Sequence, residues 1–130
     1  MDENAIRWKV TDPLGNEIVL REIDMNDHII SDHADKDAAI RVAIEDEVKY
    51  TLQHPRFILK DKKFVNRWRY FDLAAVPFGE DQKLKGVGII VEVEIRPFRV
   101  VTWYARRVID EPYKDEELIY DARVQRASHI

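Results

Sequence analysis

The stretch VGIIVEVEIRPFRVVTWYARR, from Val87 to Arg107, predicts the central hairpin of the fold. It consists of two runs that are rich in β-branched and aromatic residues, the types enriched in strands. Arg96 and Pro97 separate the two runs, and a proline interrupts a strand because it has no amide hydrogen to donate. We therefore expect a first strand that ends at Ile95 and a second that begins at Phe98.

Alternation along these two runs assigns residues to faces, since successive side chains of a strand point to opposite sides. The apolar side of the first strand is predicted to hold Val87, Ile89, Val91, Val93 and Ile95. Strict alternation in the second strand gives one face to Phe98, Val100, Thr102, Tyr104 and Arg106. Trp103 then falls on the opposite face.

Residues 35–54 predict the main helix. Asp35 fits the N-cap position, and Pro55 ends the helix because the residue before a proline is pushed out of the α region. Apolar residues recur every four positions between these ends, which is the period of an amphipathic helix. They are Ile40, Ile44, Val48 and Leu52.

The remaining elements complete an α+β domain. Further strands are expected at Ile6–Val10, Glu17–Arg21, Arg56–Lys60 and Phe64–Ala75, loops at Glu22–Asp35 and Pro77–Lys85, and a short helix at Glu116–Ala122. This order predicts an antiparallel sheet of about four strands packed against the main helix, with an extra N-terminal β-hairpin. We expect one domain over residues 1–130, made of the hairpin (1–21), a core (22–109) and an acidic tail (110–130).

Composition sets the class of protein. The 130 residues include no cysteine, no apolar run approaches the roughly 18 residues of a membrane helix, and the first residues lack a secretion signal. We therefore expect a cytoplasmic protein with no membrane partner.

The charges are unevenly distributed along the chain. Residues 1–55 carry a net charge of −7, residues 56–109 carry +6 and residues 110–130 carry −3. Either the cationic middle presents a patch to an anionic ligand, or the acidic ends neutralise it in the fold.

Two groups of residues are candidates for chemistry. His28 and His33 lie among aspartates. Histidines next to carboxylates can act as a general acid or base, can bind a metal, or can simply be solvated residues of a loop. We predict no metal or cofactor at these residues. Thr102, Tyr104 and Arg106 alternate along one strand, where hydroxyls and a guanidinium suit a phosphate, although the same pattern fits a core tyrosine with an arginine at its rim. Candidate substrate contacts nearby are Arg67, Arg69 and the ring of Trp103.

Short segments occur in an order that resembles the phage-associated nuclease-like domains of the barnase, EndoU, colicin and RelE group, the BECR fold. They are HIISDH (28–33), TLQHPRFI (51–58), RWRYF (67–71), GIIVEV (88–93) and VVTWYARR (100–107). The resemblance implies an α+β fold and a metal-independent, toxin-like ribonuclease in which the RNA 2′-hydroxyl attacks the adjacent phosphate. By position it implies catalytic roles for His28, His33, Thr102 and Tyr104.

We add Arg56, Arg69 and Arg106 as phosphate contacts. The chain departs from the family pattern in its N-terminal hairpin, its acidic tail and its Trp103, which stands where a small residue is more usual.

The alternative to an RNA-cleaving enzyme is a non-enzymatic interaction module that binds a protein, such as an inhibitor, or a nucleic acid. A third reading is a small-molecule pocket under the sheet. An enzyme requires His28 or His33 to lie near Thr102 and Arg106, because catalytic groups must reach one substrate.

Overall fold

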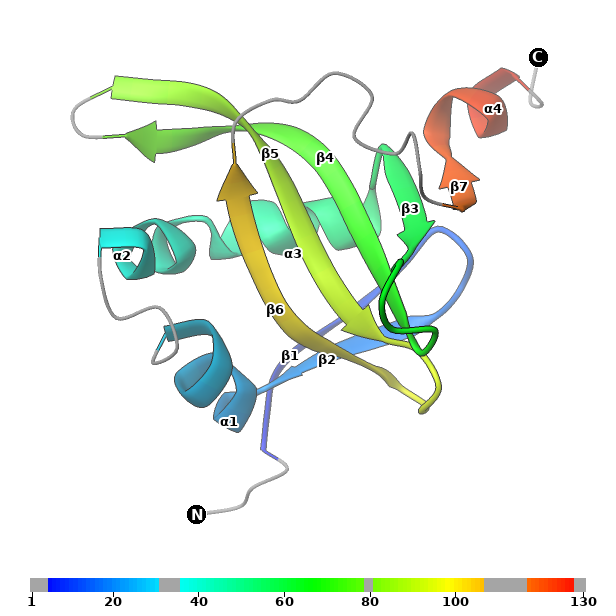
Figure 1. Cartoon of the computed structure of the whole chain (residues 1–130), viewed down its shortest axis with the longest axis horizontal. Helices are drawn as coiled ribbons and strands as arrows, with labels where there is room; N and C mark the ends of the chain where they lie inside the picture. The colour runs from blue at the N-terminus through cyan, green and yellow to red at the C-terminus, as the bar shows by residue number, and fades with distance from the viewer. Residues whose placement is uncertain (1–4, 31–35, 79–80, 107–116, 128–130) are drawn as a thin grey trace.

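A computed structural model describes residues 5–30, 36–78, 81–106 and 117–127 of the chain (Figure 1). Its strands are β1 (Ile6–Thr11), β2 (Glu17–Arg21), β3 (Phe57–Lys60), β4 (Arg67–Phe78), β5 (Asp81–Glu92), β6 (Phe98–Arg106) and β7 (Leu118–Asp121). They form one sheet in the order β1-β2-β6-β5-β4-β3-β7. Neighbouring strands are antiparallel except β2 and β6, which are parallel.

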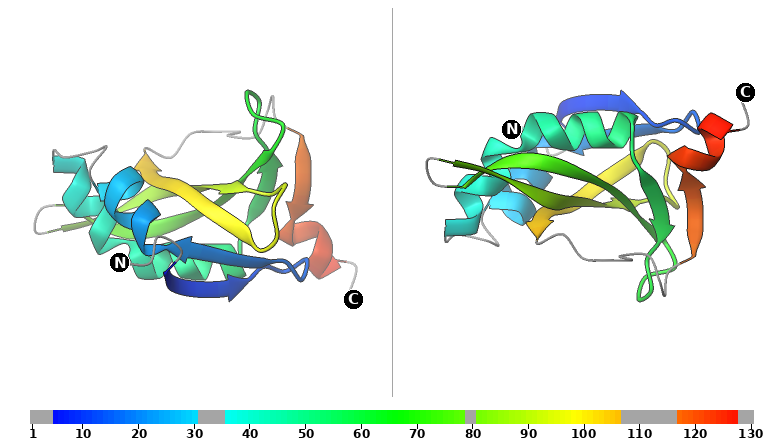
Figure 2. Two further views of the ribbon diagram at one scale, coloured as in Figure 1. Left: turned by 90° about the horizontal axis from the view of Figure 1, so that it is seen from below. Right: turned by 90° about the horizontal axis from the view of Figure 1, so that it is seen from above.

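The helices of the described residues are short. They are α1 (Glu22–Asp24), the π-helix η1 (Met25–Ile30), α2 (Lys36–Ala43), α3 (Glu45–Gln53) and α4 (Ala122–Ala127). In the views of Figure 2, α3 and the β1–β2 hairpin lie on the same side of β4 and β5. None of the described helices is long and apolar enough to cross a membrane.

The prediction of an antiparallel sheet of about four strands with a separate N-terminal hairpin is wrong, because the hairpin and the tail both extend a seven-stranded mixed sheet. The hairpin itself forms as expected, but β2 also pairs with β6 through Ile18↔Phe98 and Val19↔Arg99. At the other edge the tail supplies β7, where a helix was predicted. Both additions are pairings between distant parts of the chain.

Three segment predictions also need correction. The expected main helix is two helices, because the backbone leaves α geometry at Ile44 (φ −99°, ψ 14°), although α3 ends before Pro55 as predicted. The expected N-cap, Asp35, lies outside the described residues. Residues 22–30, expected in a loop, form α1 and η1, whereas the expected loop Pro77–Lys85 belongs largely to the ends of β4 and β5, each 12 residues long.

An irregularity in β6 reverses part of the predicted face assignment. Ile90 pairs with Thr102 but Val91 pairs with Val100, so Val101 has no partner and the side-chain alternation shifts by one residue. Phe98, Val100 and Trp103 are consequently all buried in the core, 1%, 1% and 0% exposed. Thr102, Tyr104 and Arg106 share a face with one another, as predicted, but not with Phe98 and Val100.

The sheet therefore has two different faces. The side that we call the core face packs against α2, α3 and η1 and contributes Tyr70, Val87, Ile89, Val91 and Trp103 to the main apolar cluster. The opposite side of β4, β5 and β6, which we call the open face, carries Arg69, Phe71, Thr102, Tyr104 and Arg106. A second, smaller apolar cluster at one end of the open face contains Phe57, Leu59 and Phe71.

Candidate functional site

Three rows of side chains cross the open face, because residues paired across neighbouring strands point to the same side. Each row takes one residue from β4, one from β5 and one from β6. The rows are Arg69–Ile90–Thr102, Phe71–Gly88–Tyr104 and Leu73–Gly86–Arg106. The predicted set Thr102, Tyr104 and Arg106 thus lies beside Arg69 on one surface.

Two glycines shape the centre of this surface. A Cβ on Gly88 would lie 2.3 Å from Cζ of Tyr104, and a Cβ on Gly86 would lie 2.8 Å from Cε2 of Phe71. The rings of Tyr104 and Phe71 thus lie over positions of β5 that bear no side chain, an arrangement in which a cross-strand aromatic covers a glycine. Gly88 also leaves room for a contact across β5, where Arg69 Nη1 donates a hydrogen bond of 3.1 Å to the Tyr104 hydroxyl.

Tyr104 contacts a second guanidinium on its own strand. The central guanidinium carbon of Arg106 lies 4.3 Å from the centroid of the Tyr104 ring, within the range of a cation–π interaction. Arg106 is exposed, and Tyr104 is half-buried. One phenol therefore holds two arginines from different strands close together, and such a pair offers several N–H donors to an anion.

The open face is rich in positive charge. Arg67 and Arg69 reach it from β4 and Arg99 and Arg106 from β6, while Glu92 lies between Arg67 and Arg99. The carboxylate of Glu92 accepts a hydrogen bond of 2.5 Å from the Asn66 side chain. On the other side of the sheet, the first turn of α3 is acidic, with Glu45, Asp46 and Glu47.

Four ion pairs of the described part of the acidic N-terminal region are made within that region. They are Arg7–Glu22, Arg7–Glu45, Lys9–Glu17 and Arg21–Asp24. Lys60 of the cationic middle pairs with Glu117 of the acidic tail at 3.2 Å, so part of the middle is neutralised in the fold, while Arg67, Arg69, Arg99 and Arg106 gather on the open face.

Trp103 does not belong to the open face. Its side chain is fully buried, and its indole N–H donates a hydrogen bond of 2.9 Å to the carbonyl of Arg41 in α2. The Arg41 guanidinium in turn donates to the carbonyl of Trp103 and, at 3.4 Å, to the Thr102 hydroxyl. Because the ring is not accessible, the structure gives no support to the predicted role of Trp103 as a ring on which a substrate base stacks.

Arg56 lies apart from the open face as well. Its Nε is 3.9 Å from Oδ1 of Asp72, a residue that pairs with the buried Val87 and so points to the core face. Arg56 therefore does not lie beside Arg69 and Arg106 on the open face, and its role as a phosphate contact stays a prediction.

The histidine part of the predicted site stays a prediction. The backbone of His28 lies in η1, which packs against β6, but its side chain is outside the described residues, and so is all of His33. Among the residues that the structure describes, no group of three or more His, Cys, Asp or Glu side chains could hold a metal ion.

A pocket of about 290 Å³ lies between α3 and β4, and the residues that line it were not predicted as a site. They are Asp46, Glu47, Tyr50, Thr51, Asp72, Leu73 and Ala74. Oε2 of Glu47 is buried there without a hydrogen-bond partner. The carboxylates give the pocket an acidic rim, opposite in sign to the open face.

The sequence reasoning missed Gly86 and Gly88, which allow the contacts of the open face, and Phe64, which lies exposed in the turn before β4. The signal for the glycines was their position inside a strand, which indicates close approach of other groups.

Comparison with known proteins adds no family assignment: no protein-family model, curated protein or solved structure matches the chain.

Proposed function

We propose that the protein binds RNA on its open face. The observation that supports this proposal most directly is the contact of Tyr104 with both Arg69 and Arg106. Guanidinium groups form forked hydrogen bonds with phosphate oxygens, and a phenol adds a neutral donor. The neighbouring Arg67 and Arg99 extend the positive potential along the surface, as a chain of phosphates requires.

Binding of a labelled single-stranded RNA of about 12 nucleotides, followed by fluorescence anisotropy at several salt concentrations, tests the proposal. Arg106→Glu is the informative variant, because Arg106 is exposed, so we expect its replacement to leave the fold intact. We expect an affinity about tenfold lower, equivalent to roughly 1.4 kcal/mol, and a salt slope smaller by about 1.

Lys9→Glu is the matched control, since it makes the same change of charge at a residue of β1 that is 56% exposed and ion-paired to Glu17. This variant should bind RNA nearly as the unmodified protein does. Equal losses in Arg106→Glu and Lys9→Glu would reduce the effect to net charge and argue against a site on the open face. An unmodified protein that binds no RNA would refute the proposal.

A second candidate function is metal-independent cleavage of the bound RNA, as the resemblance to BECR nucleases implies. η1, which includes His28, packs against the core face of β6, whereas Thr102 and Arg106 lie on the open face. Cleavage therefore requires a histidine to reach the open face past the edge of β6. In the proposed reaction the 2′-oxygen attacks the adjacent phosphorus and loses its proton to a base. The 5′-oxygen leaves with a proton from an acid, and a 2′,3′-cyclic phosphate remains.

Incubation of total RNA and tRNA with the protein in EDTA, over a wide pH range, tests cleavage. We expect fragments that end in a cyclic phosphate, and loss of cleavage in folded His33→Ala and Arg106→Ala variants. RNA that is bound but stays intact at every pH would leave the open face as a binding module without catalysis.

A further inference from the structure

The loop between β3 and β4, residues 61–66, is held in one shape by its own hydrogen bonds. Oδ1 of Asp61 accepts the backbone N–H groups of Lys63 (2.7 Å) and Phe64 (3.1 Å). The N–H of Asp61 donates to the carbonyl of Arg67, and the N–H of Arg67 donates to the carbonyl of Phe64, both at 3.0 Å. These bonds close the loop on itself, so its side chains are presented by a defined backbone.

Asn66 fastens the same loop to β5. Its carbonyl accepts a hydrogen bond of 2.9 Å from the N–H of Val93, and its side chain donates to Glu92. The position of the loop relative to the sheet is therefore fixed at its end next to β4. The loop and the sheet are thus held in fixed relative positions before a ligand binds. A ligand that contacts both of them loses less conformational entropy on binding.

The tip of the loop exposes an aromatic ring beside cations. Phe64 is 47% exposed and Val65 is 90% exposed, and Lys62 and Lys63 are exposed next to them. The guanidinium carbon of Arg67 lies 4.5 Å from the centroid of the Phe64 ring. This cation–π contact orients the ring and leaves a large part of it accessible to a second flat group.

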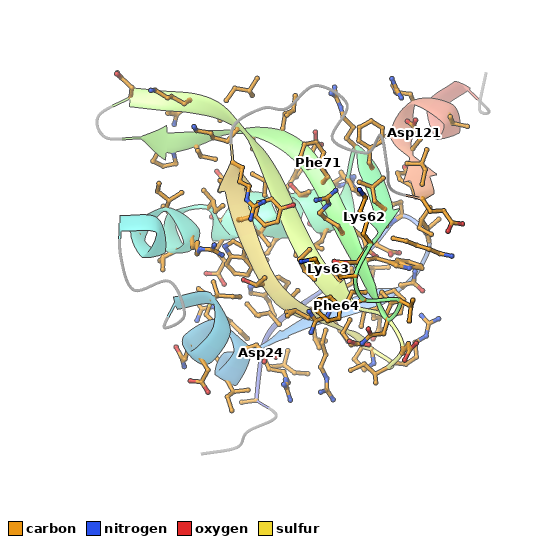
Figure 3. The ribbon with its side chains drawn as sticks, in the orientation of Figure 1. Asp24, Lys62, Lys63, Phe64, Phe71 and Asp121 are labelled. Atoms are coloured by element: carbon orange, nitrogen blue, oxygen red, sulfur yellow. The ribbon has the colours of Figure 1, made fainter. Side chains whose placement is uncertain are left out.

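The loop stands on the side of the sheet that bears the open face. In both views of Figure 2 it projects from the sheet away from α3. Figure 3 labels Lys62, Lys63 and Phe64 in front of the sheet, on the side from which Phe71 of the open face is seen. Arg67, which contacts Phe64, also belongs to the open face through its pairing with Glu92.

We propose that Phe64 stacks on an unpaired base of an RNA whose phosphates lie along the open face, with Lys62 and Lys63 contacting the backbone beside that base. This inference rests on the proposed RNA binding and narrows the ligand to single-stranded RNA. A base within a duplex is already stacked on both sides, whereas an unpaired base can be turned onto an aromatic ring. The cations around the ring favour a polyanion over an apolar protein partner.

Phe64→Ala and Val65→Ala form a matched pair for the test, because they remove exposed apolar side chains from neighbouring positions of the loop. The probes are a single-stranded RNA of about 12 nucleotides, a duplex of the same sequence and an oligomer in which several bases are replaced by abasic sites. We expect Phe64→Ala to lower affinity for the single strand by about tenfold and Val65→Ala to change it little. Binding of the abasic oligomer should be the same in both variants.

The variant Phe64→Trp allows stacking to be detected by fluorescence, a signal that would not change if Phe64 only stabilised the loop. A tryptophan at this position should restore affinity, and its fluorescence should be quenched when single-stranded RNA binds, because stacking brings the indole against a base. Tyr50→Trp, at an exposed aromatic residue of α3 on the other side of the sheet, should show no such quenching.

Each outcome separates this inference from the proposed function. If Arg106→Glu weakens RNA binding but Phe64→Ala and Val65→Ala bind alike, RNA binding stands and stacking on Phe64 is refuted. Equal affinity for the single strand and the duplex would also refute it, as would unquenched fluorescence in Phe64→Trp. If the unmodified protein binds no RNA, both proposals fail together.

Discussion

The hydroxyl of Tyr70 donates a hydrogen bond of 2.5 Å to Oδ2 of Asp12, which joins the turn between β1 and β2 to the first half of β4. Both residues are buried, 0% and 4% exposed. Oδ1 of Asp12 also accepts the backbone N–H groups of Leu14 and Asn16. Burial and the neighbouring carboxylate of Asp12 raise the pKa of Tyr70, so the phenol stays a donor. The N-terminal hairpin is therefore part of the main core.

Tyr70→Phe should lower the free energy of unfolding by about 1–3 kcal/mol, because the buried carboxylate of Asp12 loses a donor that water does not replace. Urea denaturation measures the change. Tyr50→Phe is the control, since Tyr50 is 63% exposed, and this variant should match the unmodified protein. A Tyr70→Phe variant as stable as the Tyr50→Phe variant would contradict the role given to this bond.

Glu45 should make the stability depend on acid pH. Its carboxylate accepts hydrogen bonds from Arg7 (2.6 and 3.0 Å) and from the Trp8 indole (2.8 Å). The bond from Arg7, followed by that from Trp8, outweighs desolvation and holds the pKa of Glu45 below its ordinary value of 4.5. A carboxyl whose pKa is lowered by folding stabilises the protein above its unfolded pKa. That contribution is lost as the pH falls through the folded value.

We therefore expect Glu45→Gln to be less stable than the unmodified protein at neutral pH, by about 1 kcal/mol because Arg7 is partly exposed. The difference should shrink as the pH drops below 4.5. Chemical denaturation at a series of pH values measures it. Glu17→Gln, at an exposed ion pair with Lys9, should be destabilised less than Glu45→Gln at neutral pH. If the difference in free energy of unfolding between Glu45→Gln and the unmodified protein stayed constant down to strongly acidic pH, Glu45 would not be the source of the pH dependence.

Gly88→Ala should disturb the candidate site more than Gly86→Ala. The new methyl group at Gly88 meets the ring of Tyr104, which must move away from Arg69, whereas at Gly86 it meets the ring of Phe71. Both variants should lose about 1–3 kcal/mol of stability through overpacking. Only Gly88→Ala should also weaken RNA binding, measured by anisotropy on folded protein. Equal RNA affinities in the two variants would show that the position of Tyr104 does not matter for binding.

The elements that the sequence predicted well are those set by local pattern. Alternation identified Val87, Ile89 and Val91 as buried, and the turn residues between Thr11 and Glu17 gave the N-terminal hairpin. Gly15, at φ +87°, occupies the turn conformation that favours glycine. Such features depend on a few neighbouring residues, so a single sequence is sufficient to read them.

What escaped prediction depends on contacts between distant segments or on one inserted residue. The parallel pairing of β2 with β6 rests on two residue pairs that no local pattern marks. The unpaired Val101 shifts the alternation of β6, so Phe98 and Trp103 share the core face although an odd number of steps separates them. Arg69 and Tyr104 meet only because Gly88 lies between them, a contact that the glycine's position within a strand could have suggested.

Trp103→Phe distinguishes a core role for this residue from the substrate contact that the sequence suggested. Its indole is fully buried and donates to the carbonyl of Arg41, so phenylalanine leaves a smaller ring and an unpaired acceptor. We expect stability to fall by about 2–4 kcal/mol, from lost packing and a lost hydrogen bond, when urea denaturation is measured. RNA affinity of the folded variant should be unchanged, because Tyr104 and Arg106 lie on the opposite face of the sheet. An affinity that falls while stability is preserved would instead place Trp103 in contact with the ligand.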